Sequence, residues 1–236
     1  MGKRRRATPV VLPIRGTPIF PDPEPYDGEG LVAIGGDLRP ATLLAAYRAG
    51  IFPWFGEGEV PLWWSPDPRA VIDPERLHVS RSLARRLRQP GFRLHWNGDF
   101  VGVMTACGES RATGTWIVPE MIAAYHELHR LGHAHSLEVR VDGALVGGVY
   151  GVQIGGLFAA ESMFHRQTDM SKVALVALVR SLFAAGVELL DVQFATDHLR
   201  SLGVHELTRR EYLARLRVAV GRTVDLRTLV PSLEPV

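Results

Sequence analysis

The sequence predicts an α+β protein of one or two domains, and three observations support this prediction. The chain has 236 residues, which is enough for about one large or two small domains. Its composition, 46% apolar and 22% charged, is typical of a soluble globular protein and excludes disordered, collagen-like and disulfide-rich classes. Strand-like and helix-like patterns also alternate along the chain, as they do in mixed folds.

Neither a membrane span nor a secretion signal is apparent. The longest uninterrupted apolar stretch, Val173 to Val179, is far shorter than the roughly 20 residues that a membrane-spanning helix requires. The basic start, Lys3 to Arg6, is not followed by the apolar segment of a signal peptide. A single cysteine, Cys107, cannot form an internal disulfide bond. We therefore expect a cytoplasmic protein with no membrane partner.

The first part of the chain predicts a small N-terminal α/β unit, residues 1–75. Residues 1–29 are proline-rich and predict an extended or mobile arm. Residues 30–38 form a short apolar strand closed by a Gly-Gly turn, and Pro40 to Ala49 has helical spacing that ends at Gly50. Residues 51–69 hold three of the five tryptophans among prolines that forbid a long helix, which predicts a rigid aromatic loop.

The rest of the chain, residues 76–236, predicts three consecutive strands, a helix and a fourth strand. Before them come a basic helix capped by Ser80 and an amphipathic helix that ends at Gly132. After them, Thr208 and Glu211 predict a capping box at the start of a last helix. The expected helices span residues 81–88, 119–131 and 171–185, and the expected strands span 137–141, 144–153, 157–164 and 188–194.

This order of strands and helix resembles the acetyltransferase-like (GNAT-like) fold. We therefore expect the small N-terminal α/β unit to pack on a C-terminal acetyltransferase-like domain, although a fold alone does not give a function. Acetyltransferases that use coenzyme A carry a glycine-containing turn before the helix that begins near Ser171. Residues 165–170 contain no glycine, so we do not expect a coenzyme A donor. We expect no other cofactor either.

Metal-dependent and phosphate-binding chemistry also lack their signatures. His126, His129, His133 and His135 do not have the i, i+4 spacing of a helical zinc motif, and Gly132 separates the two pairs. The chain has no Gly-x-Ser-x-Gly nucleophile turn and no P-loop. We therefore expect no metal site, no hydrolase triad and no nucleotide-hydrolysing site.

Polar residues inside apolar strands are the strongest candidates for chemistry. Asp191 and Gln193 are two residues apart in one predicted strand and should project from the same face. Glu161 lies in a neighbouring predicted strand. A buried carboxylate is costly unless it is paired or functional, so an ion pair with an arginine is the alternative to a catalytic role.

Two further groups predict contacts with a large ligand. Trp54 and Trp116 are candidates for gripping a flat ligand, and packing in the core is the alternative for each. Arg81, Arg85 and Arg86 fall within one short helix. The chain has only two lysines, so its high arginine count says little, but this clustering is typical of contacts with phosphate groups.

Seven longer motifs carry a resemblance to a known family. They are GLVAIGGDL (30–38), GIFPWF (50–55), WWSPDPRAV (63–71), GTWI (114–117), AYHELHRLGHAHS (124–136), ESMF (161–164) and DVQ (191–193). On these motifs the chain resembles the bacterial leucyl/phenylalanyl-tRNA protein transferases from about Gly30 to Tyr212. The resemblance implies transfer of leucine or phenylalanine, and more weakly methionine, from charged tRNA to an N-terminal arginine or lysine of a protein. It also implies that a Clp-type protease adaptor recognises the product, in the N-end rule pathway of degradation.

Matched position by position, the resemblance also implies roles for individual residues. Asp191 and Gln193 would lie at the reacting centre, and Trp54, Trp116 and Glu161 around the 3′ adenosine of the tRNA and the substrates. The resemblance also implies that Arg81, Arg85 and Arg86 contact the phosphate groups of the tRNA. The pocket for the transferred side chain would be lined by Val149, Phe158, Met163, Leu175, Leu178 and Leu190. The family's pattern has bulkier methionine and phenylalanine where this chain has Val149 and Leu178.

An aminoacyl ester is already activated, so this reaction requires no ATP, metal or covalent nucleophile. We expect the amide oxygen of Gln193 to accept a hydrogen bond from the attacking amine. We expect Asp191 to orient Gln193 and to stabilise the positive charge that develops on nitrogen. Either Glu161 or Asp191 would meet the basic side chain of the acceptor. An acetyltransferase that uses acyl-CoA and a non-catalytic tRNA- or peptide-binding module remain the alternatives.

Overall fold

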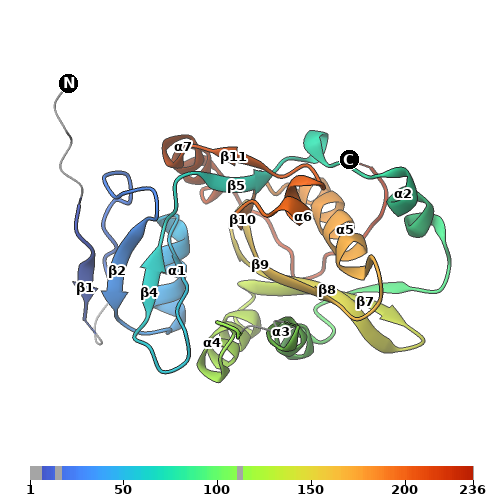
Figure 1. The fold of residues 1–236 in the computed structure, drawn as a ribbon, viewed down its shortest axis with the longest axis horizontal. Helices are drawn as coiled ribbons and strands as arrows, with labels where there is room; N and C mark the ends of the chain where they lie inside the picture. The colour runs from blue at the N-terminus through green and yellow to red at the C-terminus, as the bar shows by residue number, and fades with distance from the viewer. Residues whose placement is uncertain (1–6, 14–17, 111–113, 236) are drawn as a thin grey trace.

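The computed structural model describes residues 7–13, 18–110 and 114–235, and it contains two β-sheets (Figure 1). The smaller sheet has the strand order β1-β2-β4-β3, and the larger has the order β11-β5-β10-β9-β8-β7-β6. One apolar core joins the smaller sheet to one face of the larger, and a second core lies on the opposite face. The α+β class is confirmed.

The smaller sheet and one helix form the N-terminal unit. Its strands are β1 (Val10–Leu12), β2 (Leu31–Gly35), β3 (Phe52–Pro53) and β4 (Leu62–Trp64). The helix α1 (Pro40–Arg48) begins with a proline, whose missing N–H costs nothing in the first turn of a helix, and buries Leu43 and Tyr47. The Trp63 indole is fully buried and donates to the carbonyl oxygen of Gly35 at 2.8 Å. The predicted helix is thus present, and the aromatic loop contains two short strands.

The described part of the proline-rich arm contains one short strand and a turn, and it is anchored to the rest of the molecule. Its strand β1 pairs in parallel with β2. Further along the arm, the buried guanidinium of Arg209 donates hydrogen bonds to the carbonyl oxygens of Pro23, Tyr26 and Asp27. An arginine near the far end of the chain therefore fastens this arm to the larger unit.

The larger sheet contains the predicted order of strands and helix. Strands β7 (Ala134–Val141), β8 (Ala144–Ile154) and β9 (Leu157–His165) form an antiparallel meander. The helix α5 (Met170–Ala184) then crosses over, and β10 (Leu189–Gln193) pairs in parallel with β9. The sheet is extended by β5 (Arg69–Ile72) and β11 (His205–Leu207) at one edge and by β6 (Arg93–Trp96) at the other.

Helices cover both faces of the larger sheet, with α5 on one face and α3 and α4 on the other (Figure 1). Their bounds are α3 (Phe100–Glu109) and α4 (Pro119–Arg130), and the remaining helices are η1 (Pro74–Arg76), α2 (Arg81–Arg88), α6 (Asp197–Arg200) and α7 (Arg209–Ala219). The predicted Ser80 cap and the Thr208–Glu211 capping box are both present. Within the described residues, no helix is long and apolar enough to cross a membrane.

The boundary between the two units is set by β5. This strand pairs with β10 and β11, so residues 69–72 belong to the larger sheet rather than to the N-terminal unit expected for residues 1–75. Pro66 and Pro68 separate these four residues from the short strands before them, but the sequence analysis had included Arg69 in the aromatic loop. We therefore propose a division just before Arg69.

Candidate active site

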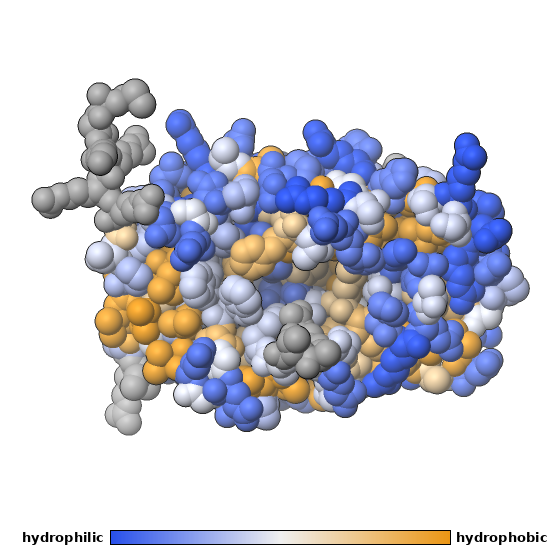
Figure 2. Space-filling model, viewed as in Figure 1, coloured by the Kyte–Doolittle hydropathy of each residue, from blue (hydrophilic) through white to orange (hydrophobic). Residues whose placement is uncertain are grey.

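A cavity of about 310 Å³ opens where the N-terminal unit meets the larger sheet. Figure 2 shows the molecular surface hollowed near the centre of this face. The cavity walls come from β3, β8, β9, α5 and β10, from the segments after β3 and β10, and from the segment before α4. Its lining residues are Phe52, Pro53, Trp54, Trp116, Val149, Ala160, Glu161, Ser162, Met163, Leu175, Val192, Gln193, Phe194, Thr196 and Leu199.

Seven of the predicted site residues line this cavity. They are Trp54, Trp116, Val149, Glu161, Met163, Leu175 and Gln193. Phe158, Leu178 and Leu190, which were expected to line it as well, are completely buried in the core on the α5 side. That core also contains Val149 and Leu175. These three side chains therefore support the wall from behind, which corrects the predicted lining.

An aromatic rim at the mouth of the cavity was only partly predicted. Trp54 and Phe194 are each 44% exposed, and their ring centroids lie 5.7 Å apart. Phe52 meets Phe194 edge to face at 6.0 Å. The sequence offered a weak signal for both phenylalanines, since Phe52 lies in the aromatic loop and Phe194 directly follows Gln193. Such a rim can hold a planar ring against an exposed apolar surface.

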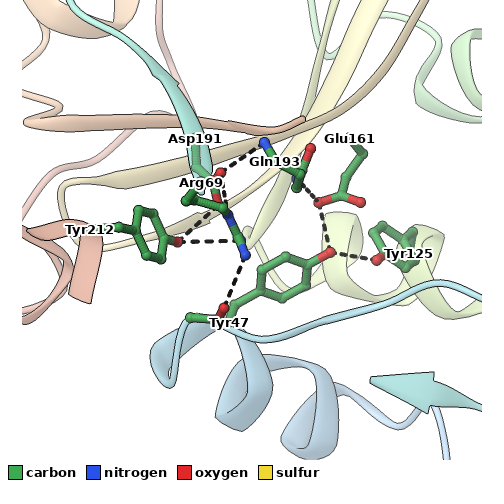
Figure 3. A network of polar contacts seen from close by, with 8 residues as sticks. Tyr47, Arg69, Tyr125, Glu161, Asp191, Gln193 and Tyr212 are labelled. Carbon is green, nitrogen blue, oxygen red and sulfur yellow. Dashed lines mark hydrogen bonds and ion pairs between the residues drawn. The ribbon is translucent and has the colours of Figure 1, made fainter. Parts of the chain in front are cut away.

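Asp191 lies behind the cavity in a fully buried ion pair (Figure 3). Its two carboxylate oxygens accept hydrogen bonds from Nε and Nη2 of Arg69, at 2.8 and 2.6 Å. The Tyr212 hydroxyl donates to Oδ2 at 2.9 Å. The guanidinium of Arg69 also lies over the rings of Phe52 and Tyr212. Asp191 thus forms the ion pair with an arginine that was the alternative interpretation of this carboxylate, and its partner Arg69 was missed by the sequence analysis.

Gln193 lies on a β-bulge rather than in a regular strand. The register of β10 against β5 shifts between Asp191 and Gln193, and Gln193 has φ = 58°. The backbone N–H of Gln193 donates to Oδ1 of Asp191 at 2.9 Å. The carboxylate of Asp191 thus holds the main chain of Gln193 in a conformation that a residue other than glycine rarely adopts. Both residues are buried, and of the two only Gln193 lines the cavity.

Glu161 is the carboxylate that faces the cavity. It is partly buried, and its Oε1 accepts hydrogen bonds from the Tyr47 hydroxyl at 2.8 Å and from Nε2 of Gln193 at 3.1 Å (Figure 3). Burial raises the pKa of Glu161 to about 8, and the nearby negative charge of Asp191 contributes to the increase. Among the described lining residues it is the only acidic one. With one amide N–H donated to Glu161, the oxygen of Gln193 can accept a hydrogen bond from a ligand.

The arginine cluster lies on α2, next to the start of α5. Arg81, Arg85 and Arg88 are exposed, whereas Arg86 is partly buried. The Arg86 guanidinium lies 5.5 Å from the ring centroid of Phe92 and reaches the sulfur of Met170. Of the three predicted arginines, Arg81 and Arg85 are therefore more accessible to a large ligand than Arg86.

Two of the four clustered histidines, His129 and His135, have structural partners. The ring of His129 stacks on Phe100 at 4.5 Å. His135 is buried, and its two ring nitrogens contact Asn97 and Gln153. Burial lowers the pKa of His135 to about 4. Across the described ranges, no group of three or more His, Cys, Asp or Glu side chains is arranged to hold a metal ion.

Comparisons with known proteins identify relatives across nearly the whole chain. Residues 71–217 match the family model "Leucyl/phenylalanyl-tRNA protein transferase", and residues 36–67 match the model of that protein's N-terminal domain. A leucyl/phenylalanyl-tRNA protein transferase from an Anaeromyxobacter species is 53% identical over 213 residues, which cover 89% of each chain. One from Chromohalobacter salexigens is 56% identical over 199 residues, covering 84% of this chain and 78% of the relative. Among solved structures, a GCN5-related N-acetyltransferase from Kribbella flavida matches with a TM-score of 0.41 and 13% identity, over 75% of this chain and 63% of that one.

Proposed function

The chain belongs to the leucyl/phenylalanyl-tRNA protein transferase family, and from this premise we propose the substrates and the roles of the site residues. The enzyme moves leucine or phenylalanine from its tRNA to a protein whose N-terminal residue is arginine or lysine. The product then carries an N-terminus that marks it for degradation. The observation that carries the acceptor assignment is the position of Glu161 in the wall of a largely apolar cavity, beside Gln193.

Glu161 is the group that meets the basic side chain of the acceptor. Asp191 is unavailable for this role because Arg69, Tyr212 and the backbone of Gln193 occupy its oxygens. In the free enzyme the pKa of Glu161 is about 8, so the carboxyl group is mostly protonated at pH 7. A bound guanidinium or ammonium group favours the ionised form, and the acceptor therefore displaces a proton when it binds.

The donor binds through its side chain and its tRNA. Val149, Met163 and Leu175 give the cavity an apolar wall that accepts leucine or phenylalanine and excludes charged side chains through the cost of desolvation. Trp54 and Trp116 are positioned to hold the 3′ adenosine. Arg81, Arg85 and Arg86 contribute affinity through phosphate contacts that carry no sequence information.

The reaction depends on positioning. The neutral α-amine of the acceptor attacks the ester carbonyl, a C–N bond forms, and the bond between the carbonyl carbon and the ribose oxygen breaks. The amide oxygen of Gln193 accepts a hydrogen bond from the amine, and the proton lost by nitrogen ends on the leaving ribose oxygen. Since Arg69 neutralises Asp191, the role of Asp191 is to position Gln193 rather than to stabilise charge on nitrogen.

Transfer of radiolabelled leucine tests this function. Leucyl-tRNA is incubated with the protein and two acceptors that differ only in an N-terminal arginine or alanine, without ATP or coenzyme A. We expect label in the arginine acceptor alone, and weaker or no transfer from valyl-tRNA because its side chain fills less of the cavity. Equal labelling of both acceptors would refute the acceptor assignment. If neither leucyl-tRNA nor phenylalanyl-tRNA supports transfer, and the protein instead transfers acetyl from acetyl-CoA, the proposal that aminoacyl-tRNA is the donor is wrong.

The pH dependence of transfer should reveal two ionisations. Between pH 6 and 7, kcat/KM for the arginine acceptor requires loss of a proton from Glu161, whose pKa is about 8, and from the α-amine, whose pKa is also about 8. The slope of log kcat/KM against pH should therefore approach two. In the Glu161→Gln variant only the amine titrates, and the slope should approach one. A slope of one in the wild type would contradict the assignment of Glu161.

The arginines of α2 should make tRNA binding depend on salt. We expect Arg85→Ala to weaken the binding of leucyl-tRNA several-fold and to reduce the slope of log K against log salt by about one. Arg130→Ala is a matched control, because Arg130 is an exposed arginine on α4, paired with Glu127. Binding titrations from 50 to 300 mM salt measure both slopes. Equal behaviour of the two variants would exclude a specific role for Arg85.

A further inference from the structure

A short chain of two hydroxyl groups runs from Tyr125 through Tyr47 to Glu161. The hydroxyl oxygens of Tyr125 and Tyr47 lie 2.5 Å apart, and the Tyr47 hydroxyl donates to Oε1 of Glu161 (Figure 3). Tyr47 comes from α1 and Tyr125 from α4, and both side chains are fully or almost fully buried. Two elements outside the strands that carry Glu161 and Gln193 therefore contribute to this corner of the cavity.

Ionisation of Glu161 fixes the direction of the hydrogen bonds. A carboxylate can only accept, so when Glu161 is ionised Tyr47 donates its one proton to it and Tyr125 donates to Tyr47. Burial raises the pKa of both tyrosines well above 10, so both remain protonated donors. Each bond in such a chain polarises the next, which strengthens the donation to the carboxylate.

The same geometry selects the oxygen of Glu161 that meets a ligand. Tyr47 and Gln193 both donate to Oε1. Oε2 is therefore the oxygen available to a cationic group in the cavity. Tyr47 and Gln193 approach from different elements and together fix the orientation of the carboxyl group.

Several groups around Glu161 influence its ionisation, and Tyr47 is the uncharged group among them that favours it. Asp191 on β10 opposes ionisation of Glu161, Arg69 on β5 favours it, and these two are paired with each other. Burial also opposes ionisation, whereas the hydrogen bond from Tyr47 lowers the pKa of Glu161. Tyr47 is thus a neutral group that stabilises the carboxylate without competing for a cationic ligand.

We propose that Tyr47, supported by Tyr125, is a positioning residue that orients the Glu161 carboxyl group and favours its ionised form when a cation binds, and so sets the preference for a basic acceptor. This inference rests on the proposed function. According to this proposal, residues of both structural units select the acceptor: Tyr47 on α1 and Glu161 on β9. Removing the Tyr47 hydroxyl should raise the pKa of Glu161 and weaken recognition of a cationic acceptor more than recognition of a neutral one.

The test compares acceptors with an N-terminal arginine or its neutral isostere citrulline. The ratio of kcat/KM for the two acceptors is measured at pH 7 and pH 9, so that a general loss of activity cancels. We expect Tyr47→Phe to lower the ratio about tenfold at pH 7 and by less at pH 9, where more of Glu161 is ionised. Tyr125→Phe should lower it about threefold, since Tyr125 acts only through Tyr47. Tyr26→Phe, which removes a hydroxyl elsewhere in the N-terminal unit, should leave it unchanged.

Other outcomes overturn the proposal in distinguishable ways. If Tyr47→Phe slows both acceptors equally at both pH values, Tyr47 is merely structural and the inference is wrong while the proposed function stands. If the wild type does not transfer leucine to the arginine acceptor, the proposed function fails and the inference fails with it. A titration of the Glu161 carboxyl carbon by NMR, in wild type and Tyr47→Phe, requires no activity. An unchanged midpoint would also refute the inference.

Discussion

Arg69→Leu is expected to lower the free energy of unfolding by about 3–5 kcal/mol, because it leaves Asp191 as an uncompensated buried charge. Both side chains are only 1% exposed, and two hydrogen bonds join them. The substitution also removes the guanidinium that lies over the rings of Phe52 and Tyr212. Urea unfolding of the wild type and the variant measures the difference.

Two further variants separate the buried charge from the loss of packing. The double variant Arg69→Leu/Asp191→Leu should be more stable than Arg69→Leu alone, because neither charge is then left unpaired. Arg215→Ala should cost at most about 1 kcal/mol, since Arg215 pairs with Asp73 in a partly exposed position. A loss of less than about 1 kcal/mol in Arg69→Leu would contradict the account of this ion pair.

Gln193→Ala is expected to lower kcat by about a hundredfold, with little change in KM for leucyl-tRNA. The reason is that the Gln193 amide oxygen accepts a hydrogen bond from the amine during attack, whereas most tRNA contacts lie elsewhere. The variant also removes one donor to Glu161. Steady-state kinetics at saturating acceptor separates the two effects, because weaker acceptor binding raises the KM for the acceptor rather than lowering kcat.

A second variant, Asp191→Asn, tests whether kcat depends on how Gln193 is positioned. Asp191→Asn keeps the size of the side chain at residue 191 but weakens its hold on the Gln193 backbone, so kcat should fall in the same direction. Urea unfolding of both variants identifies any loss caused by instability. An unchanged kcat in Gln193→Ala would exclude the proposed hydrogen bond to the amine.

The sequence predicted the centre of the larger sheet because each element there carries a strong local signal. The meander has alternating apolar residues and the Asp142-Gly143 turn, and α5 is a long apolar helix. Strands β5, β6 and β11 and the helix α3 were missed. The α3 sequence contains two glycines, which disfavour a helix in isolation. Its Asp99 cap and its burial against β8 and β9 stabilise it, and burial of this kind depends on tertiary contacts.

The site was predicted in part, for similar reasons. A polar residue in an apolar strand is visible in sequence, so Glu161, Asp191 and Gln193 were found. Their partners were not, because Arg69 and Asp191 are 122 residues apart and Tyr47 and Glu161 are 114 apart. The bulge between Asp191 and Gln193 was also missed, since it arises from pairing with β5.

The most direct test of the account is the acceptor preference of Glu161→Gln and Glu161→Asp. The measurement is kcat/KM at pH 8 for acceptors with N-terminal arginine and citrulline, with leucyl-tRNA as donor. We expect the wild type to prefer arginine strongly, Glu161→Gln to lose this preference, and Glu161→Asp to retain part of it. If Glu161→Gln still prefers arginine as strongly as the wild type, another group selects the basic acceptor and the assignment of Glu161 is wrong.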